Sequence, residues 1–133
     1  MKKICIILST YSSGVTNKVY ASTKKEFLKN KDINIQTLKV TGSFEIPVAI
    51  SRNIKKYDGF VAIGCIIKGK TKNFDLITSS ITDAIMYLSI ISKKPIGNAI
   101  LTCFNASQAK QRFSKGSEAA KAVIAVLNNV PEK

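Results

Sequence analysis

Residues 69–76, GKTKNFDL, bring together groups that suit an anion. The segment holds two lysines, a threonine hydroxyl and a run of backbone N–H groups ahead of a predicted helix, which are features of phosphate sites. Residues 64–71, GCIIKGKT, match the Walker spacing G-x-x-x-x-G-K-[ST], but the first half of that match lies in an apolar run that predicts a strand and not in a glycine-rich loop, so the spacing alone does not indicate a Walker loop. Asp75 is its one acid, and the chain contains no histidine. The segment therefore predicts phosphate binding, while the group that would move protons there is unassigned.

Residues 41–47, TGSFEIP, combine an aromatic ring and a carboxylate beside a glycine. Phe44 could stack on a planar ligand, and Glu45 could accept hydrogen bonds from the hydroxyl groups of that ligand. A second interpretation is structural: Phe44 packs into the core, and Glu45 supplies a negative charge to the first turn of a helix. Tyr11, after the first apolar run, offers either a second flat surface or an ordinary residue of a surface turn.

Arg112 and Lys115 place two cationic donors three residues apart. Arg112 is one of only two arginines among the 21 basic residues of the chain. A planar, forked guanidinium is the donor that phosphate recognition favours, so this pair is a second candidate for binding a phosphate. The alternative is that both side chains belong to a solvated helix end.

The chain of 133 residues carries a net charge of +13, which raises the question of a nucleic-acid partner. Its lysines cluster near the ends of predicted helices, with little aromatic interleaving for base stacking. We therefore expect a solvated basic surface and no nucleic-acid partner, although a small anionic ligand fits either interpretation. The length corresponds to one domain over residues 1–133.

The three cysteines, Cys5, Cys65 and Cys103, lie in or beside different apolar runs and show no C-x-x-C spacing. We expect buried, reduced thiols rather than a disulfide framework or a metal site. No window approaches ~18 uninterrupted apolar residues, and the N-terminal run lacks the cleavage-site pattern of a signal peptide. The sequence thus predicts a cytoplasmic protein without a membrane span and without a metal.

Strand and helix patterns alternate along the chain. Short β-branched runs predict strands at residues 3–8, 33–40, 60–67 and 96–103. Apolar residues at three- and four-residue spacing predict helices at 15–30, 47–56, 75–92, 107–113 and 116–129. This alternation indicates right-handed βαβ units in an α/β fold, with a four-stranded parallel sheet and helices on both faces. Ligands of such sheets bind outside the carboxyl ends of the strands, where loops 9–14, 41–47, 68–74 and 103–106 converge.

Four segments resemble, in order and spacing, the signature of lumazine synthase, an enzyme of riboflavin biosynthesis. They are TGSFEIP at 41–47, GCIIKGKTKNFD at 64–75, QAKQR at 108–112 and KGSEAA at 115–120. The resemblance implies a single-domain, three-layer α/β/α fold of the flavodoxin-like type. It implies a transferase that condenses 5-amino-6-(D-ribitylamino)uracil with 3,4-dihydroxy-2-butanone 4-phosphate, through an imine and without metal or cofactor. It also implies a homo-oligomer, a pentamer or a multiple of it, with its pockets between adjacent subunits.

The resemblance further implies roles for individual residues. Contacts to the pyrimidine and its ribityl chain fall to Tyr11, Ser43, Phe44, Glu45, Ile66, Ile67 and Asn98. The phosphate falls to Gly69, Lys70, Thr71 and Arg112, and the Arg112 side of the pocket comes from the neighbouring chain. The catalytic positions are Asn73, Lys115 and Glu118, of which Glu118 matches the acidic partner of the family's histidine.

Three features depart from the family pattern. Asn73 stands where the family has its histidine, Asn98 replaces an aromatic residue often found on the fourth strand, and a glycine-containing stretch is shortened to Phe113 and Ser114. General acid–base catalysis contributes ~10²–10⁴-fold, whereas holding two reactants in place supplies ~7–11 kcal/mol. We therefore expect an active but slower enzyme, with protons moved by water, by the substrate phosphate or by a lysine such as Lys72. The alternative is a weakened family member that binds flavin or lumazine as an oligomeric scaffold.

Overall fold

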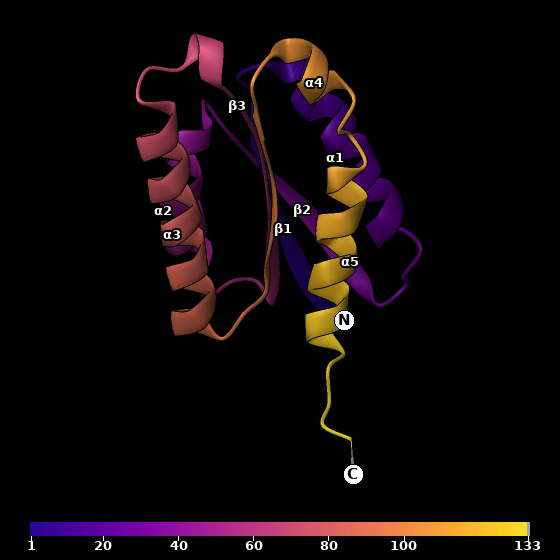
Figure 1. Ribbon diagram of the computed structural model, residues 1–133. Coiled ribbons are helices and arrows are strands. Elements are labelled where there is room, and N and C mark those ends of the chain that lie inside the picture. Colours follow the sequence, from indigo (N-terminus) through magenta and orange to yellow (C-terminus); the bar gives the residue numbers. More distant parts are fainter. Residues whose placement is uncertain (133) are drawn as a thin grey trace.

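Four apolar runs form one parallel sheet in the computed structural model, which describes residues 1–132 (Figure 1). The strands are β1 (Lys2–Ser9), β2 (Ile33–Val40), β3 (Gly59–Ile67) and β4 (Ile96–Cys103). The helices are α1 (Ser13–Phe27), α2 (Ile46–Asn53), α3 (Phe74–Ser92), α4 (Ala106–Lys110) and α5 (Lys115–Leu127). Two 3₁₀ turns, η1 (Ser43–Glu45) and η2 (Lys68–Lys70), follow β2 and β3.

Helices cover both faces of the sheet. In Figure 1, α2 and α3 lie on one side and α1 and α5 on the other, while α4 lies beyond the end of β4. Successive side chains of a strand point to opposite faces, so Ile4 and Ile6 enter the core beneath α1 and α5, whereas Cys5 and Ile7 enter the core beneath α2 and α3. The strand order β2-β1-β3-β4 is that of flavodoxin-like sheets. The predicted three-layer α/β/α fold is thereby confirmed.

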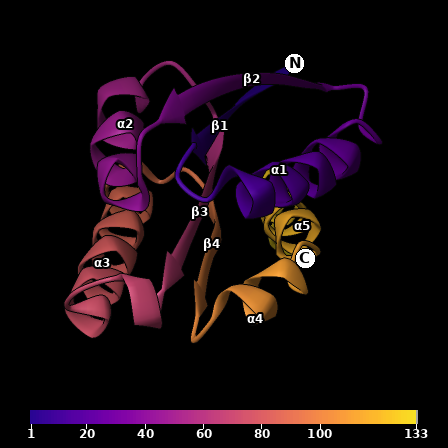
Figure 2. The same ribbon diagram turned by 90° about the horizontal axis from the view of Figure 1, so that it is seen from above.

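The central strand β3 is buried along its whole length. It pairs with β1 on one side and β4 on the other, and helices cover both of its faces. This burial explains why its sequence is continuously apolar instead of alternating. Because all the strands are parallel, the loops that follow them meet at one edge of the sheet, as predicted. Figure 2 views the molecule from this edge.

The helices α1 and α5 approach each other closely at Gly116. A side chain at this position would overlap the carbonyl oxygen of Val19 and the hydroxyl of Thr23, so the packing requires glycine. One residue later, the backbone N–H of Ser117 donates to Oγ of Ser22 at 3.0 Å. These contacts hold the start of α5 and therefore also the turn before it, which carries the predicted phosphate-binding arginine.

The outer face of α3 is apolar and uncovered in the single chain. Its more than half-exposed side chains are Leu76, Met86, Tyr87, Ile90 and Ile91. Within residues 1–132, α3 is also the one helix long and apolar enough to cross a membrane by length and composition. That result is weak evidence for one helix, because core helices of soluble proteins and signal sequences meet the same criteria. Polar residues such as Asp75, Thr78 and Asp83 interrupt the helix, so it contains no window of ~18 uninterrupted apolar residues, the criterion on which the sequence predicted no span.

The predicted strands and helices are all present, and their differences from prediction lie at the ends. The helix predicted over residues 15–30 ends at Phe27, and the one predicted over 47–56 ends at Asn53. The turns η1 and η2 lie in segments predicted to be loops. The expectation of buried, unpaired thiols is confirmed for all three cysteines.

Candidate active site

The turn η1 rests directly on the central strand. Ser43 Oγ occupies the space that a side chain at Gly64 of β3 would fill, and a methyl group there would overlap this hydroxyl. The same methyl group would lie 3.4 Å from Ile46 Cδ1, at the start of α2. Glycine at position 64 therefore allows the segment between β2 and α2 to sit against β3. Ser43, predicted as a ligand contact, directs its side chain at the sheet.

The side chains that follow Ser43 point to two different environments. Phe44 is 66% exposed, so the interpretation in which its ring packs into the core is wrong. Glu45 is half-buried, and Thr41 donates a hydrogen bond from Oγ1 to Glu45 Oε1 at 3.1 Å. Glu45 also directly precedes α2, where a negative charge is favourable. Tyr11, in the turn after β1, is 53% exposed and offers a second accessible ring.

The chain passes from buried residues at the end of β3 into an exposed turn. Ile66 and Ile67 are buried, Gly69 and Lys70 are exposed, and Thr71 is half-buried. The side chains of Ile66 and Ile67 enter the cores on opposite faces of the sheet, and the exposed turn follows them directly in the sequence. Their roles in ligand binding stay predictions.

Asn73 caps the start of α3 in a left-handed backbone conformation, with φ 56° and ψ 40°. Its carbonyl oxygen accepts a hydrogen bond from the N–H of Ile77 at 2.9 Å. Asparagine enters the left-handed region more readily than most residues, and histidine is also enriched there. The side chain is exposed, so the backbone at this position is compatible with the family's histidine as well as with the asparagine present.

A cavity of about 240 Å³ opens at the free edge of the sheet, between β4 and α3. Four of the predicted site residues line it: Ile66, Asn98, Arg112 and Lys115. The hydroxyl of Thr78 is also there, and it is buried without a hydrogen-bond partner among the described residues. The cavity thus combines an apolar floor, two cationic groups and an unpaired hydroxyl, a composition suited to a polar anionic ligand.

The predicted site residues therefore fall into two groups. The edge cavity brings Asn98 together with Arg112 and Lys115, but its lining does not include Phe44 or Thr71. Glu118, predicted to act beside Lys115, is exposed on α5 and is also not among the residues that line this cavity.

Phe104 is an aromatic residue to which sequence reasoning gave no role. It directly follows β4 and is 67% exposed, and Lys68 Nζ lies 5.5 Å from the centroid of its ring. This cation–π contact joins the turn after β3 to the segment after β4. The signal that could have found it is an aromatic residue immediately after a predicted strand, at the edge where ligands bind.

The thiols near this edge are poor candidates for nucleophiles. Burial, together with the neighbouring Cys103 and against the opposing effect of Lys70, raises the pKa of Cys65 to about 11. Burial also raises the pKa of Cys103, an effect that Arg112 opposes. Both thiols are therefore protonated near neutral pH, whereas the thiolate is the reactive form. Within residues 1–132, no group of three or more His, Cys, Asp or Glu side chains gathers to hold a metal ion.

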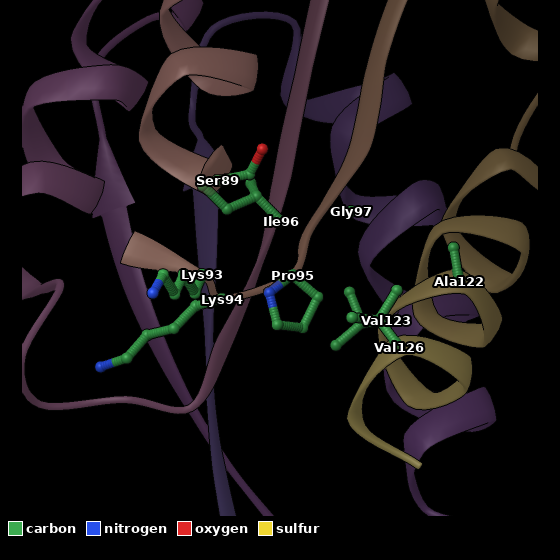
Figure 3. Close-up of a pocket in the computed structure, with 9 residues that line it drawn as sticks. All are labelled: Ser89, Lys93, Lys94, Pro95, Ile96, Gly97, Ala122, Val123 and Val126. Atoms are coloured by element: carbon green, nitrogen blue, oxygen red, sulfur yellow. The ribbon is translucent and has the colours of Figure 1, made fainter. Parts of the chain in front are cut away.

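A second cavity, of about 300 Å³, lies at the other end of β4 (Figure 3). Its apolar wall comes from Pro95 and from Val123 and Val126 of α5. Figure 3 shows the side chains of Lys93 and Lys94 extending away from that wall. It lies at the amino end of the strand, opposite to the edge where parallel sheets bind ligands.

The family model and the sequence relatives that match this chain point to one family. The model of the 6,7-dimethyl-8-ribityllumazine synthase family matches residues 1–130. The 6,7-dimethyl-8-ribityllumazine synthase of Polaromonas sp. strain JS666 is 35% identical over 134 residues, which cover 97% of this chain and 87% of the relative. That of Verminephrobacter eiseniae is 35% identical over 130 residues, covering 94% and 84%. A solved lipoprotein fragment from Peptoclostridium difficile 630 shares the fold alone, with a TM-score of 0.57, 12% identity and coverage of 96% and 100%.

The contact between Gly64 and Ser43 predicts a compensating pair of substitutions. Gly64→Ala should lower the free energy of unfolding by about 1–3 kcal/mol, because the new methyl group displaces η1. Gly64→Ala combined with Ser43→Ala should recover most of that loss, since the overlapping hydroxyl is removed. Urea denaturation at one fixed protein concentration measures both effects.

Gly14→Ala is the matched control, because a methyl group there meets no atom within 4 Å. Equal unfolding free energies for the wild type and Gly64→Ala would contradict the packing of η1 against β3 at Gly64.

Proposed function

The chain belongs to the 6,7-dimethyl-8-ribityllumazine synthase family, and from this we infer a transferase that forms 6,7-dimethyl-8-ribityllumazine in riboflavin biosynthesis. Its proposed substrates are 5-amino-6-(D-ribitylamino)uracil and 3,4-dihydroxy-2-butanone 4-phosphate. The observation that carries the proposal is the family match over residues 1–130. The grouping of accessible rings, a carboxylate and cationic side chains around the carboxyl edge of the sheet supports it.

The pyrimidine and its ribityl chain are proposed to bind beside η1. The exposed rings of Phe44 and Tyr11 provide surfaces for a planar heterocycle. Glu45, with one oxygen already held by Thr41, can accept hydrogen bonds from the ribityl hydroxyls with the other. Ile66 and Ile67, the last two residues of β3, are the proposed apolar positions beside the pyrimidine, with side chains that face opposite sides of the sheet. This arrangement orients the amine of the pyrimidine toward the turn after β3.

The phosphorylated ketone is proposed to bind between the two groups of site residues. Gly69, Lys70 and Thr71 offer donors on one side, and Arg112 and Lys115 offer cationic donors on the other. Arg112 lines a cavity at the open edge of β4. A neighbouring chain docked at that edge would therefore have Arg112 of this chain beside its own substrate-binding residues. We therefore propose that each complete site contains residues of two chains.

A homo-oligomer, a pentamer or a multiple of it, is the assembly we propose. The uncovered apolar face of α3 supports this, since contiguous exposed apolar surface marks association sites. We take residues 1–133 as one domain and place the protein in the cytoplasm, with no membrane or nucleic-acid partner. The lysines that make the surface basic lie mostly near helix ends and turns, with little aromatic interleaving, which supports their role as a solvated surface.

The proposed reaction proceeds by positioning more than by acid–base chemistry. The amine attacks the ketone and loses water to form an imine, phosphate is eliminated, and the ribityl-bearing nitrogen adds to the remaining carbonyl group and loses a second water to close the ring. Holding the two reactants together supplies ~7–11 kcal/mol of the barrier reduction. The amide of Asn73 can hold a water molecule or a substrate oxygen, but it cannot act as a base near neutral pH. Protons therefore pass through water, the substrate phosphate or a lysine such as Lys72.

Formation of lumazine by the purified protein is the direct test. With both substrates present, the increase in lumazine absorbance should be faster than the uncatalysed condensation at the same concentrations. A rate equal to that background would refute the enzymatic function. If the ribitylaminouracil still bound under those conditions, the protein would instead be a ligand-binding scaffold.

Asn73→His should raise turnover by about ten-fold or more, because an imidazole adds general acid–base catalysis. The left-handed backbone at this position accepts histidine. The pH–rate profile should gain an inflection near the histidine pKa of ~6.5. Asn73→Gln is the control, since it keeps an amide and adds no base. Unchanged turnover in Asn73→His would show that the missing imidazole does not limit the rate.

Arg112→Ala should raise the KM for the phosphorylated ketone by about ten-fold or more, because a charge-assisted contact to phosphate is lost. The KM for the ribitylaminouracil should change little. Arg52→Ala is the control, since the only other arginine lies on α2. An unaltered KM for the ketone in Arg112→Ala would refute the phosphate role of that residue.

Mixed oligomers then test whether Arg112 acts across an interface. Glu45→Ala and Arg112→Ala are each expected to be impaired alone. After an equal mixture is unfolded and refolded, about a quarter of the sites should contain both Glu45 from one chain and Arg112 from its neighbour. The reason is that Glu45 is intact in about half of the chains and Arg112 in the other half. Activity no higher than the mean of the separate variants would place both halves within one chain.

A further inference from the structure

We propose that Thr41 is a positioning residue that fixes the Glu45 carboxylate for binding of the ribityl chain. Thr41 Oγ1 donates to Glu45 Oε1 at 3.1 Å. The two residues are four apart: Thr41 lies two residues before the η1 turn, and Glu45 is the last residue of that turn. This inference rests on the proposed function, because it assigns Glu45 to the ribityl chain of the pyrimidine substrate.

Thr41 is itself held by the sheet. It directly follows Val40, the last residue of β2, and the N–H of Thr10 donates to the Val40 carbonyl at 2.8 Å. That bond ties the end of β2 to the end of β1. The hydroxyl of Thr41 therefore projects from an anchored backbone, so it can define the position of a longer and more mobile side chain such as glutamate.

Gly42 leaves space for this contact. A methyl group on Gly42 would lie 3.0 Å from Glu45 Oε1, closer than ordinary van der Waals contact. The carbonyl of Gly42 also accepts a hydrogen bond from the N–H of Glu45 at 3.2 Å, which closes the turn. The backbone of Glu45 is thus fixed by the turn, and its carboxylate is fixed by Thr41.

The packing of Ser43 against Gly64 holds the turn on the central strand but does not touch the carboxylate. Of these contacts, only the Thr41 hydroxyl sets which way the carboxylate points. A carboxylate has about four acceptor positions, so Oε1 can be held while Oε2 accepts from ligand hydroxyls. Losing the hydroxyl of Thr41 releases the side chain to other rotamers, and affinity for a hydroxylated chain falls.

Thr41→Val removes the hydroxyl while keeping the size and branching of the side chain. We expect the KM for the ribitylaminouracil to rise about five-fold, as for the loss of one hydrogen bond. The kcat and the KM for the phosphorylated ketone should stay within about two-fold of wild type, and Thr41→Ser should restore the wild-type KM. Thr37→Val is the matched control, because it removes another exposed hydroxyl, which bonds to Tyr20 at 2.9 Å.

A double-mutant cycle shows whether Thr41 acts through Glu45. If it does, adding Thr41→Val to Glu45→Ala should change the KM for the ribitylaminouracil by less than about two-fold. A pyrimidine that carries a methylamino group in place of the ribitylamino group should bind to wild type and to Thr41→Val equally. A merely structural role would instead weaken the binding of both pyrimidines and add to the effect of Glu45→Ala.

Calorimetric binding of the ribitylaminouracil separates this proposal from the proposed function. Wild type that binds the pyrimidine without forming lumazine would overturn the enzymatic function, while the comparison with Thr41→Val still tests positioning. Equal affinity in wild type and Thr41→Val would overturn the role of Thr41. Additive effects in the cycle, or no binding by the wild type, would overturn it as well.

Discussion

The complete burial of β3 is the constraint on which the rest of the structure depends. A strand buried on both faces must satisfy its backbone groups with neighbouring strands, and β3 does so with β1 and β4. Because those neighbours are parallel, each connection must cross over one face of the sheet, and the crossing helices supply the two outer layers. The same arrangement brings every carboxyl end to one edge. At Gly64, the η1 turn packs directly against this strand, because Ser43 of η1 fills the space that a side chain would occupy.

The distribution of functional groups favours positioning over proton transfer. The chain has no histidine, and burial keeps the thiols of Cys65 and Cys103 protonated by raising their pKa values. What the carboxyl edge offers instead is accessible rings, a held carboxylate and cationic donors. Such groups bind and orient two reactants, and for the joining of an amine to a ketone the gain from orientation exceeds the ~10²–10⁴-fold contribution of a general acid or base.

Two neighbouring surfaces of the single chain expose groups that proteins usually cover: a strand edge and an apolar helix face. Among residues 1–132, no strand pairs with the outer edge of β4, and a cavity lined by Arg112 opens along it. On the adjoining face, the outer side of α3 exposes large apolar side chains. An unpaired strand edge and an apolar helix face both favour association. The proposed sharing of each site between chains would use these surfaces together, so that assembly and completion of the site become one event.

The sequence by itself determined the fold, because short β-branched apolar runs alternate with longer segments of helical periodicity, and length and β-branching together separate the buried strands from the helices. The run FVAIGCII predicted a strand buried on both faces, and its place among alternating elements predicted where the loops would meet. The segments TGSFEIP and GKTKNFD also predicted the family. Spacing along the chain could not predict distances across the fold, however. That Phe44 points outward, that Ser43 packs against Gly64 and that Thr41 holds Glu45 depend on how η1 meets β3. Nor could it predict that Arg112 lies at the edge of β4, away from Phe44, since only the packing of α5 against α1 at Gly116 sets the turn that carries it.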